Sequence, residues 1–202
     1  MNEPQRTAAP SRGPRTTPPG VIDLLSGGEF NFLDPRASLF TAEDVARGLS
    51  HICRFTGHVD RFYSVAEHSV HCSYLVPDHL ALTALCHDAA EAFLGDVSAP
   101  LKALLPDYKA LEERAEAVVL PRLGARYPIP AAVKHIDMRM LAAEKLQVVG
   151  CFKIWPMLSG IDQAAVRIGY WPPRLAARVW LDRFGELGGV RLAWADGAGA
   201  QI

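Results

Sequence analysis

The segment HDAAEAFLGD, residues 87–96, places a histidine and three acidic residues within one short apolar stretch. On a helix, Glu91 lies four residues after His87 and three after Asp88, so these three side chains share one face. Ionised carboxylates in an apolar wall are costly unless they are paired or bind a metal, and the segment has no Lys or Arg. The pattern therefore favours a metal site, and the simpler alternative is a helix end with solvated acids.

Two adjacent residues cannot complete a metal site, so further ligands must come from elsewhere in the chain. His68, in SVAEHSVHCSYL, is the first candidate. Asp137, in VKHIDMRMLAAE, is the second, because it lies one or two turns into a later predicted helix. Imidazoles combined with carboxylates favour Mn, Fe, Co, Ni or Zn over Mg. Such an ion can act as a Lewis acid and lower the pKa of a bound water molecule.

At these positions the sequence resembles the HD superfamily of metal-dependent phosphohydrolases, whose pattern is His, then His-Asp, then a distant Asp. The resemblance rests on YSVAEHS, HDAAEAFLGD, APLKALLPDYKALE and IDMRML. Within the superfamily, the chain is most similar to the bacterial 5′-deoxynucleotidases and the viral dATP triphosphohydrolases. The resemblance to the viral dATP triphosphohydrolases extends further and covers roughly residues 27–188. It includes the segments GGEFNFLDP, LSHICRFTGH and the closing FGEL.

The resemblance implies a role for each matching residue. It assigns a divalent transition metal (Mn, Co, Zn, Fe or Ni) to four ligands, which are His68, His87, Asp88 and Asp137. Glu91 and Asp96 match the acid–base and water-positioning carboxylates of the family. One of these two carboxylates would orient the attacking water or protonate the leaving oxygen.

Basic residues near the predicted site are candidates for substrate binding. Arg54 and Arg61 flank the FTGHVD loop, Lys102 follows the site, and His58 lies within the loop. The family uses basic residues at similar places to hold phosphate or sugar, and the arginine fork suits bidentate contacts to phosphate. The alternative for each is an ordinary surface residue, which fits Arg54 least because its surroundings are apolar.

Three classes of function fit this pattern. The first is a phosphohydrolase whose substrate is a small-molecule nucleotide. It would be either a dNTP triphosphohydrolase acting on dATP or a similar dNTP, or a 5′-deoxynucleotidase acting on dNMPs. The longer resemblance, to the viral dATP triphosphohydrolases, favours the triphosphohydrolase. The second is a non-catalytic HD module that binds a nucleotide. The third is a scaffold with a structural ion, which would be closed by protein ligands, whereas a catalytic site leaves room for water.

Composition limits the remaining possibilities. The chain has 202 residues, which is enough for one catalytic domain. It has 21 Lys plus Arg against 22 Asp plus Glu, and this balanced charge argues against nucleic acid or a membrane surface as a partner. Four cysteines without a C-x-x-C spacing favour free thiols in a cytoplasmic setting. No stretch resembles a signal peptide or a membrane span. We also expect a homo-oligomer.

The elements that position the site are predicted to be helical. Residues 1–20 are expected to form a disordered tail, 21–190 the HD domain, and 191–202 a flexible tail. Two apolar runs around Gly27 and Gly28 predict a β-hairpin. Helices are then expected within 41–55, 64–75, 78–95, 107–123, 130–149 and 173–187, with capping boxes at Thr41 and Ser64. The fold class is therefore all-α, an HD-domain helical bundle with a short N-terminal β-hairpin.

Overall fold

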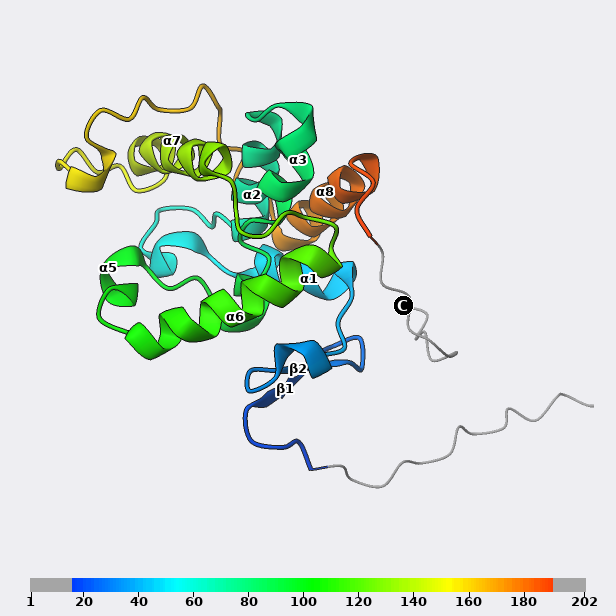
Figure 1. Cartoon of the computed structure of the whole chain (residues 1–202). Helices are drawn as coiled ribbons and strands as arrows, with labels where there is room; N and C mark the ends of the chain where they lie inside the picture. Colours follow the sequence, from blue (N-terminus) through cyan, green and yellow to red (C-terminus); the bar gives the residue numbers. More distant parts are fainter. Residues whose placement is uncertain (1–15, 191–202) are drawn as a thin grey trace, which may run out of the picture.

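The computed structural model describes residues 16–190, which form a helical bundle with a two-stranded hairpin at one side (Figure 1). The tails predicted at 1–20 and 191–202 lie outside the described residues, apart from 16–20. The longer helices are α1 (Ala42–His51), α2 (Val65–Tyr74), α3 (Asp78–Cys86), α6 (Pro106–Arg122), α7 (Ala131–Gln147) and α8 (Pro173–Glu186). Short helices are α4 (Glu91–Leu94), α5 (Ala99–Lys102), and the 3-10 turns η1 (Pro35–Ala37), η2 (Arg54–Gly57) and η3 (Pro156–Leu158). The predicted all-α fold with an N-terminal hairpin is confirmed.

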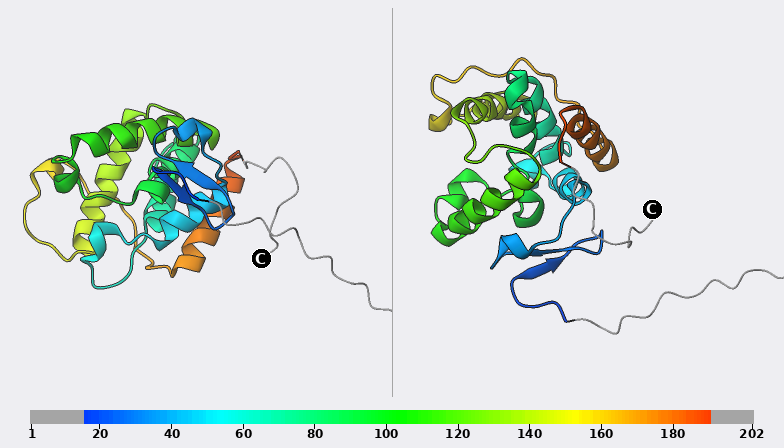
Figure 2. Two further views of the ribbon diagram at one scale, coloured as in Figure 1. Left: turned by 90° about the horizontal axis from the view of Figure 1, so that it is seen from below. Right: turned by 45° about the vertical axis from the view of Figure 1, so that its right-hand side comes forward.

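The hairpin pairs β1 (Val21–Asp23) with β2 (Glu29–Asn31) in antiparallel register, and the right view of Figure 2 shows it below the helical bundle. Gly27 in the connection has a φ of +88°, a backbone conformation that glycine adopts without strain. Phe30 is fully buried, and its ring stacks on that of Phe93 with 4.2 Å between the centroids. This aromatic contact fixes the hairpin to the bundle.

The capping box predicted at Thr41 is confirmed. The Thr41 side chain accepts a hydrogen bond from the backbone N–H of Asp44, and the Asp44 carboxylate accepts one from the backbone N–H of Thr41. At α2 only half of the predicted box forms, because the Ser64 hydroxyl accepts from the Glu67 N–H but the Glu67 carboxylate points elsewhere. The Glu67 carboxylate instead accepts three hydrogen bonds at 2.6–2.9 Å, from the backbone N–H groups of Gly169, Tyr170 and Trp171.

The single helix predicted across 78–95 is wrong. Helix α3 ends at Cys86, residues 87–90 form a turn, and α4 begins at Glu91. Backbone N–H groups in the turn donate to carbonyls three residues back, from Ala89 to Cys86 and from Glu91 to Asp88. This tighter winding turns the chain at His87 and Asp88, and Gly95 then ends α4 with a φ of +81°, as its sequence position predicted.

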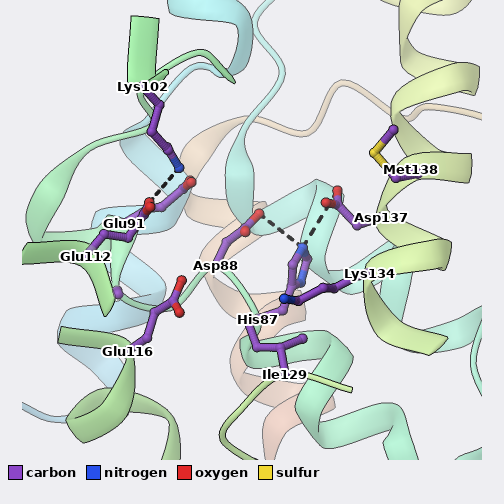
Figure 3. Close-up of a pocket in the computed structure, with 11 residues that line it drawn as sticks. His87, Asp88, Glu91, Lys102, Glu112, Glu116, Ile129, Lys134, Asp137 and Met138 are labelled. Atoms are coloured by element: carbon purple, nitrogen blue, oxygen red, sulfur yellow. Dashed lines mark hydrogen bonds and ion pairs between the residues drawn. The ribbon is translucent and has the colours of Figure 1, made fainter. Parts of the chain in front are cut away.

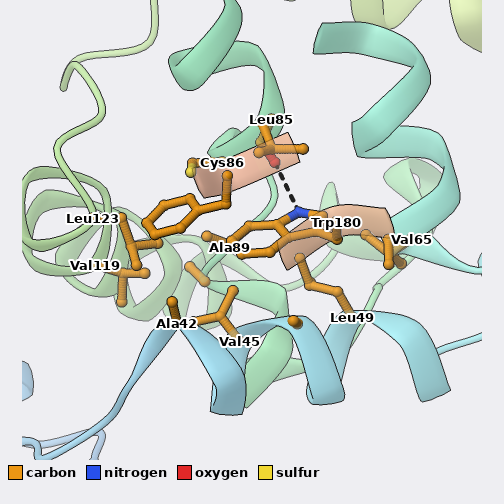
Figure 4. Packing of buried hydrophobic residues seen from close by; sticks show 14 of the residues in the cluster. Ala42, Val45, Leu49, Val65, Leu85, Cys86, Ala89, Val119, Leu123 and Trp180 are labelled. Atoms are coloured by element: carbon orange, nitrogen blue, oxygen red, sulfur yellow. Dashed lines mark hydrogen bonds between the residues drawn. The ribbon is translucent and has the colours of Figure 1, made fainter. Parts of the chain in front are cut away.

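Trp180 of α8 lies at the centre of the larger hydrophobic core (Figure 4). Its side chain is fully buried, and its indole N–H donates to the Leu85 carbonyl at 3.2 Å. Helix α8 contacts α1, α2 and α3, so this one tryptophan packs among the helices that lead into the site. A second cluster, which includes Tyr63 and Met140, packs α2 and α3 against α7.

Two further sequence-based expectations concern the chain as a whole. All four cysteines are free thiols, and Cys72 and Cys86 are buried, as core positions predict. Within residues 16–190 no helix is both long enough and apolar enough to cross a membrane.

Candidate metal centre

Four side chains that sequence reasoning singled out as metal ligands converge on one point. The Nε2 atoms of His68 and His87 are 3.3 Å apart. An Asp137 oxygen lies 3.2 Å from Nε2 of His68, and an Asp88 oxygen lies 3.3 Å from Nε2 of His87. An ion bound about 2.1 Å from tetrahedral ligands would separate those ligands by roughly 3.4 Å. The four donor atoms therefore have the spacing of a coordination shell.

Three segments of the fold supply these atoms. His68 lies in the first turn of α2, which begins after the Ser64 cap, and its side chain is fully buried. His87 follows the last residue of α3, and Asp88 comes next in the turn. Asp137 lies in α7 and is more open to solvent (Figure 3). The tight turn after α3 lets two adjacent residues reach the same point.

Hydrogen bonds at the far nitrogen orient both imidazoles. Nδ1 of His68 donates to a Glu144 carboxylate oxygen at 2.5 Å, and Nδ1 of His87 donates to the Ala84 carbonyl at 2.8 Å. Since Nδ1 of each ring is engaged in these bonds, Nε2 faces the shared point and is the nitrogen that a metal would bind in place of a proton. A carboxylate or carbonyl partner on the far nitrogen is the usual support of histidine ligands to metals. The donor set therefore fits a divalent transition metal.

The carboxylates also give this point a strongly negative potential. Burial alone would lower the pKa of His87, but Asp88 and Asp137 raise it to about 10. Burial likewise opposes ionisation of Asp137, yet its hydrogen bonds to His68 and His87 hold the pKa of Asp137 well below its usual range. Groups that attract protons this strongly also attract a metal cation at the same place.

Cys72 is a possible ligand that sequence reasoning did not identify. Its buried Sγ lies 3.5 Å from Nε2 of His68, and His68, Cys72 and His87 together form a group that could hold a metal ion. The signal was present in the sequence, because Cys72 follows His68 by four residues and so lies on the same helical face.

A cavity of about 310 Å³ opens directly beside the candidate ligands (Figure 3). His87, Asp88 and Asp137 form one wall with Lys134 beside His87, and across from them stand Glu91, Glu112, Glu116 and Lys102. The site therefore has room for water and a small ligand beside the ligand cluster, which is the arrangement of a catalytic rather than a closed structural site.

Glu91 stands out in this cavity because its carboxyl group is buried and incompletely bonded. The residue is only 9% exposed, and its Oε2 atom has no hydrogen-bond partner among residues 16–190. Burial, with further contributions from the carboxylates of Asp88 and Asp96, raises the pKa of Glu91 well above its usual range. A raised pKa favours the protonated form of this carboxyl group, which is the form that can donate a proton. Asp96, the other predicted acid, does not line the cavity, and burial raises its pKa as well.

The predicted substrate-binding residues do not come together. The Arg54 guanidinium is buried, 3.0 Å from Glu144 and 3.6 Å from Asp88. Lys102 lines the cavity but pairs with Glu112 at 2.5 Å. Arg61 lies over the Tyr170 ring in a different cavity, and His58 is exposed in the loop after η2.

Glu144 links several of these residues and was missed by sequence reasoning. Its fully buried carboxylate accepts from Nδ1 of His68, from the Tyr63 hydroxyl at 2.7 Å and from Arg54. Burial would raise the pKa of Glu144, but Arg54 and His68 lower it to about 2, so the carboxylate is ionised. Glu144 follows Asp137 by seven residues, two helical turns, which is the only local signal that it shares the site.

Two relatives show the family of this chain. It is 40% identical over 172 residues to the uncharacterised protein YfdR of Escherichia coli K12, which covers 84% of this chain and 97% of YfdR. An uncharacterised protein of Rhodobacter capsulatus is 37% identical over 141 residues, covering 63% of this chain and 72% of that protein. The chain therefore belongs to the YfdR family. No family model matches it.

A third, more distant relative has a stated activity. A 5′-deoxynucleotidase of Pasteurella multocida is 31% identical over 90 residues, covering 43% of this chain and 46% of that enzyme. This similarity supports a nucleotide hydrolase in general for the chain, and the ligand cluster supports a bound divalent metal.

Proposed function

We propose that this protein is an HD-type phosphohydrolase that uses one divalent transition metal to hydrolyse deoxynucleoside monophosphates. The observation that carries the proposal is the convergence of two Nε2 atoms and two aspartate oxygens at the wall of a cavity. The same cavity contains the carboxyl group of Glu91, whose Oε2 has no hydrogen-bond partner among residues 16–190. The similarity to a 5′-deoxynucleotidase supports the same class of reaction.

The side chains of the cavity divide the work of hydrolysis. A metal held by His68, His87, Asp88 and Asp137 would supply Lewis-acid polarisation of the phosphoryl group. Glu91, whose pKa burial raises, would give its proton to the leaving 5′ oxygen of the sugar as a water molecule attacks the phosphorus, and the proton that this water loses would restore Glu91. Lys134 and Lys102, at the edge of the same cavity, place positive charge beside the bound phosphate. Glu144 keeps His68 in the tautomer that presents Nε2.

The charge of the cavity favours a monophosphate over a triphosphate. Its lining residues include five acidic side chains, those of Asp88, Glu91, Glu112, Glu116 and Asp137, of which Glu91 is the proposed proton donor, and two lysines. A triphosphate would bring several negative charges into this surrounding, and the arginines predicted to neutralise it lie elsewhere or already pair with carboxylates. The dNTP triphosphohydrolase is the second candidate, supported by the likeness of GGEFNFLDP and LSHICRFTGH to that group.

Product chromatography separates these reactions. The protein is incubated with dNMPs and dNTPs in the presence of Mn, Co or Zn. We expect deoxynucleoside and inorganic phosphate from dNMPs. Release of intact triphosphate from dATP, with dAMP untouched, would establish the second candidate instead, and nucleotide binding without hydrolysis under every metal would leave a binding module.

Metal content tests the ligand assignment independently of the substrate. Protein purified without chelator should contain about one ion per chain, and His87→Ala should lose both the ion and thermal stability, because metal binding by three segments is linked to folding. His135→Ala is the matched control, since His135 is exposed and lies two residues before Asp137 on α7. Full metal occupancy in the His87 variant contradicts the assignment.

Turnover tests the role of Glu91. Glu91→Gln should reduce turnover by at least ~100-fold with the metal retained, as expected for loss of a positioned acid. Glu113→Gln, the same change at an exposed position of α6, should leave turnover unchanged. Normal turnover in a folded, metal-loaded Glu91 variant would transfer the role to Asp96.

A further inference from the structure

A second cavity, of about 560 Å³, lies where the segment between α7 and α8 passes the end of α7 (Figure 1). It shares no lining residue with the cavity beside the candidate metal ligands. Its lining consists of Arg61, Gln147, Arg167, Ile168, Gly169 and Tyr170. Volumes of this size are typical of sites for small molecules.

Hydrogen bonds fix the wall of this cavity from two sides. On one side, Gln147 accepts from the Ile168 N–H at 3.2 Å and donates to the Val166 carbonyl at 3.0 Å. On the other side, the buried Glu67 carboxylate holds the N–H groups of Gly169 and Tyr170. Residues 167–170, which form this wall, are therefore fixed in place before any ligand binds, although they belong to no helix or strand.

Tyr170 adopts a strained backbone conformation within this wall. Its φ is +54°, in the left-handed region that costs a non-glycine residue about 1–2 kcal/mol. The Tyr170 hydroxyl donates to the Gln147 carbonyl at 2.5 Å, which fixes the ring as well as the backbone. The Arg61 guanidinium lies 4.2 Å from the centre of that ring, so the tyrosine places a positive charge at the cavity.

The cavity contains two arginines, Arg61 and Arg167, and both are exposed to solvent. Among residues 16–190, no carboxylate lies within ion-pair distance of Arg61 or Arg167, whereas Arg54 and Arg183 are both paired. Two unpaired guanidinium groups in one cavity make a local positive potential on a chain whose net charge is -1.

We propose that this cavity binds a small phosphate-bearing anion through Arg61 and Arg167, at a site separate from the metal centre. Guanidinium forks match phosphate oxygens in bidentate geometry, and the rigid wall reduces the entropy lost on binding. The volume of the cavity and the near-zero net charge of the chain favour a small molecule over a nucleic acid. Arg61, which the sequence placed among the substrate-binding candidates, would bind this anion rather than a substrate at the metal centre. The inference goes beyond the proposed function and does not depend on hydrolysis.

Calorimetric titration of the full-length, metal-loaded protein with inorganic pyrophosphate tests this site. Arg167→Gln and Arg61→Gln should each weaken binding by on the order of 10-fold or more, the effect of losing one charge-assisted contact. Arg178→Gln removes the same charge from an exposed position of α8 and should leave the affinity unchanged. A parallel titration with a deoxynucleoside monophosphate shows whether the occupant is a nucleotide or the free anion.

Several results would overturn the proposal. Unchanged affinity in both cavity variants would exclude the site, and equal weakening by Arg178→Gln would reduce the effect to overall charge. Loss of nucleotide hydrolysis in parallel with pyrophosphate binding in Arg167→Gln would place Arg167 in the substrate site. If the chain is not a nucleotide hydrolase, only the product assay fails, and pyrophosphate binding at Arg61 and Arg167 is unaffected. The proposed function and the proposed anion site are therefore tested independently.

Discussion

Replacement of Glu144 by Gln is the sharpest test of how the metal centre is supported. The carboxylate is fully buried and accepts from three donors, namely Nδ1 of His68, the Tyr63 hydroxyl and Arg54. Glutamine keeps the shape of the side chain, but its amide nitrogen must face one of these donors. The change also leaves the buried Arg54 without its closest carboxylate, since Asp88 lies 3.6 Å away.

The expected cost follows from these contacts. Removal of one partner from a buried ion pair typically destabilises a protein by about 3–5 kcal/mol. Loss of the carboxylate behind a histidine ligand typically weakens metal binding by about 10- to 100-fold, because the ring orientation and the tautomer are no longer fixed. We therefore expect Glu144→Gln to lower both the free energy of unfolding and the metal affinity.

Two assays measure the two effects separately. Urea unfolding of the metal-free protein gives the free energy of unfolding without a contribution from metal binding, and competition with a chromogenic chelator gives the metal affinity. Glu113→Gln is the matched control on an exposed position. If Glu144→Gln stays within ~1 kcal/mol of the wild type with unchanged metal affinity, the reasoning about this network is wrong.

Three further predictions concern other parts of the structure. Burial, followed by the charges of Glu112 and Asp88, raises the pKa of Glu116 from 4.5 to about 7, so the folded state holds a proton that the unfolded state releases. Stability should therefore fall as pH rises from 4.5 to about 7, and Glu116→Gln should remove this decline in urea unfolding at pH values across that range. Gly48→Ala would place a Cβ 2.7 Å from the Ala92 carbonyl oxygen, so it should cost about 1–3 kcal/mol in thermal unfolding and reduce turnover by displacing α4. Glu67→Gln should lower the melting temperature through a loss of about 2 kcal/mol or more, since the amide cannot accept the three backbone N–H groups equally well.

Local signals in the sequence were sufficient to predict most helices. The Thr41–Asp44 capping box and the stop at Gly95 act over a few residues, and both form as expected. The break after Cys86 was not predictable in this way, because the apolar positions continue in helical spacing through the turn at 87–90. The prediction of one long helix failed where the backbone tightened around His87 and Asp88.

Contacts between distant segments explain what sequence reasoning missed at the site. The capping box at Ser64 looked complete, but the Glu67 carboxylate found three backbone donors more than 100 residues away. Glu144 reaches His68 across 76 positions, and no local pattern marks that pairing. The four predicted ligands do lie together, whereas the roles of Glu91, Asp96 and the basic residues stay predictions.

The tether made by Glu67 has a consequence for the order in which the protein assembles during synthesis. The first turn of α2, which carries His68, is held by residues 169–171, immediately before α8. A ribosome must therefore release nearly the whole domain before this turn has all its partners, and such long-range contacts form late. Capture of the metal ion is then an event of the completed chain rather than of the nascent one.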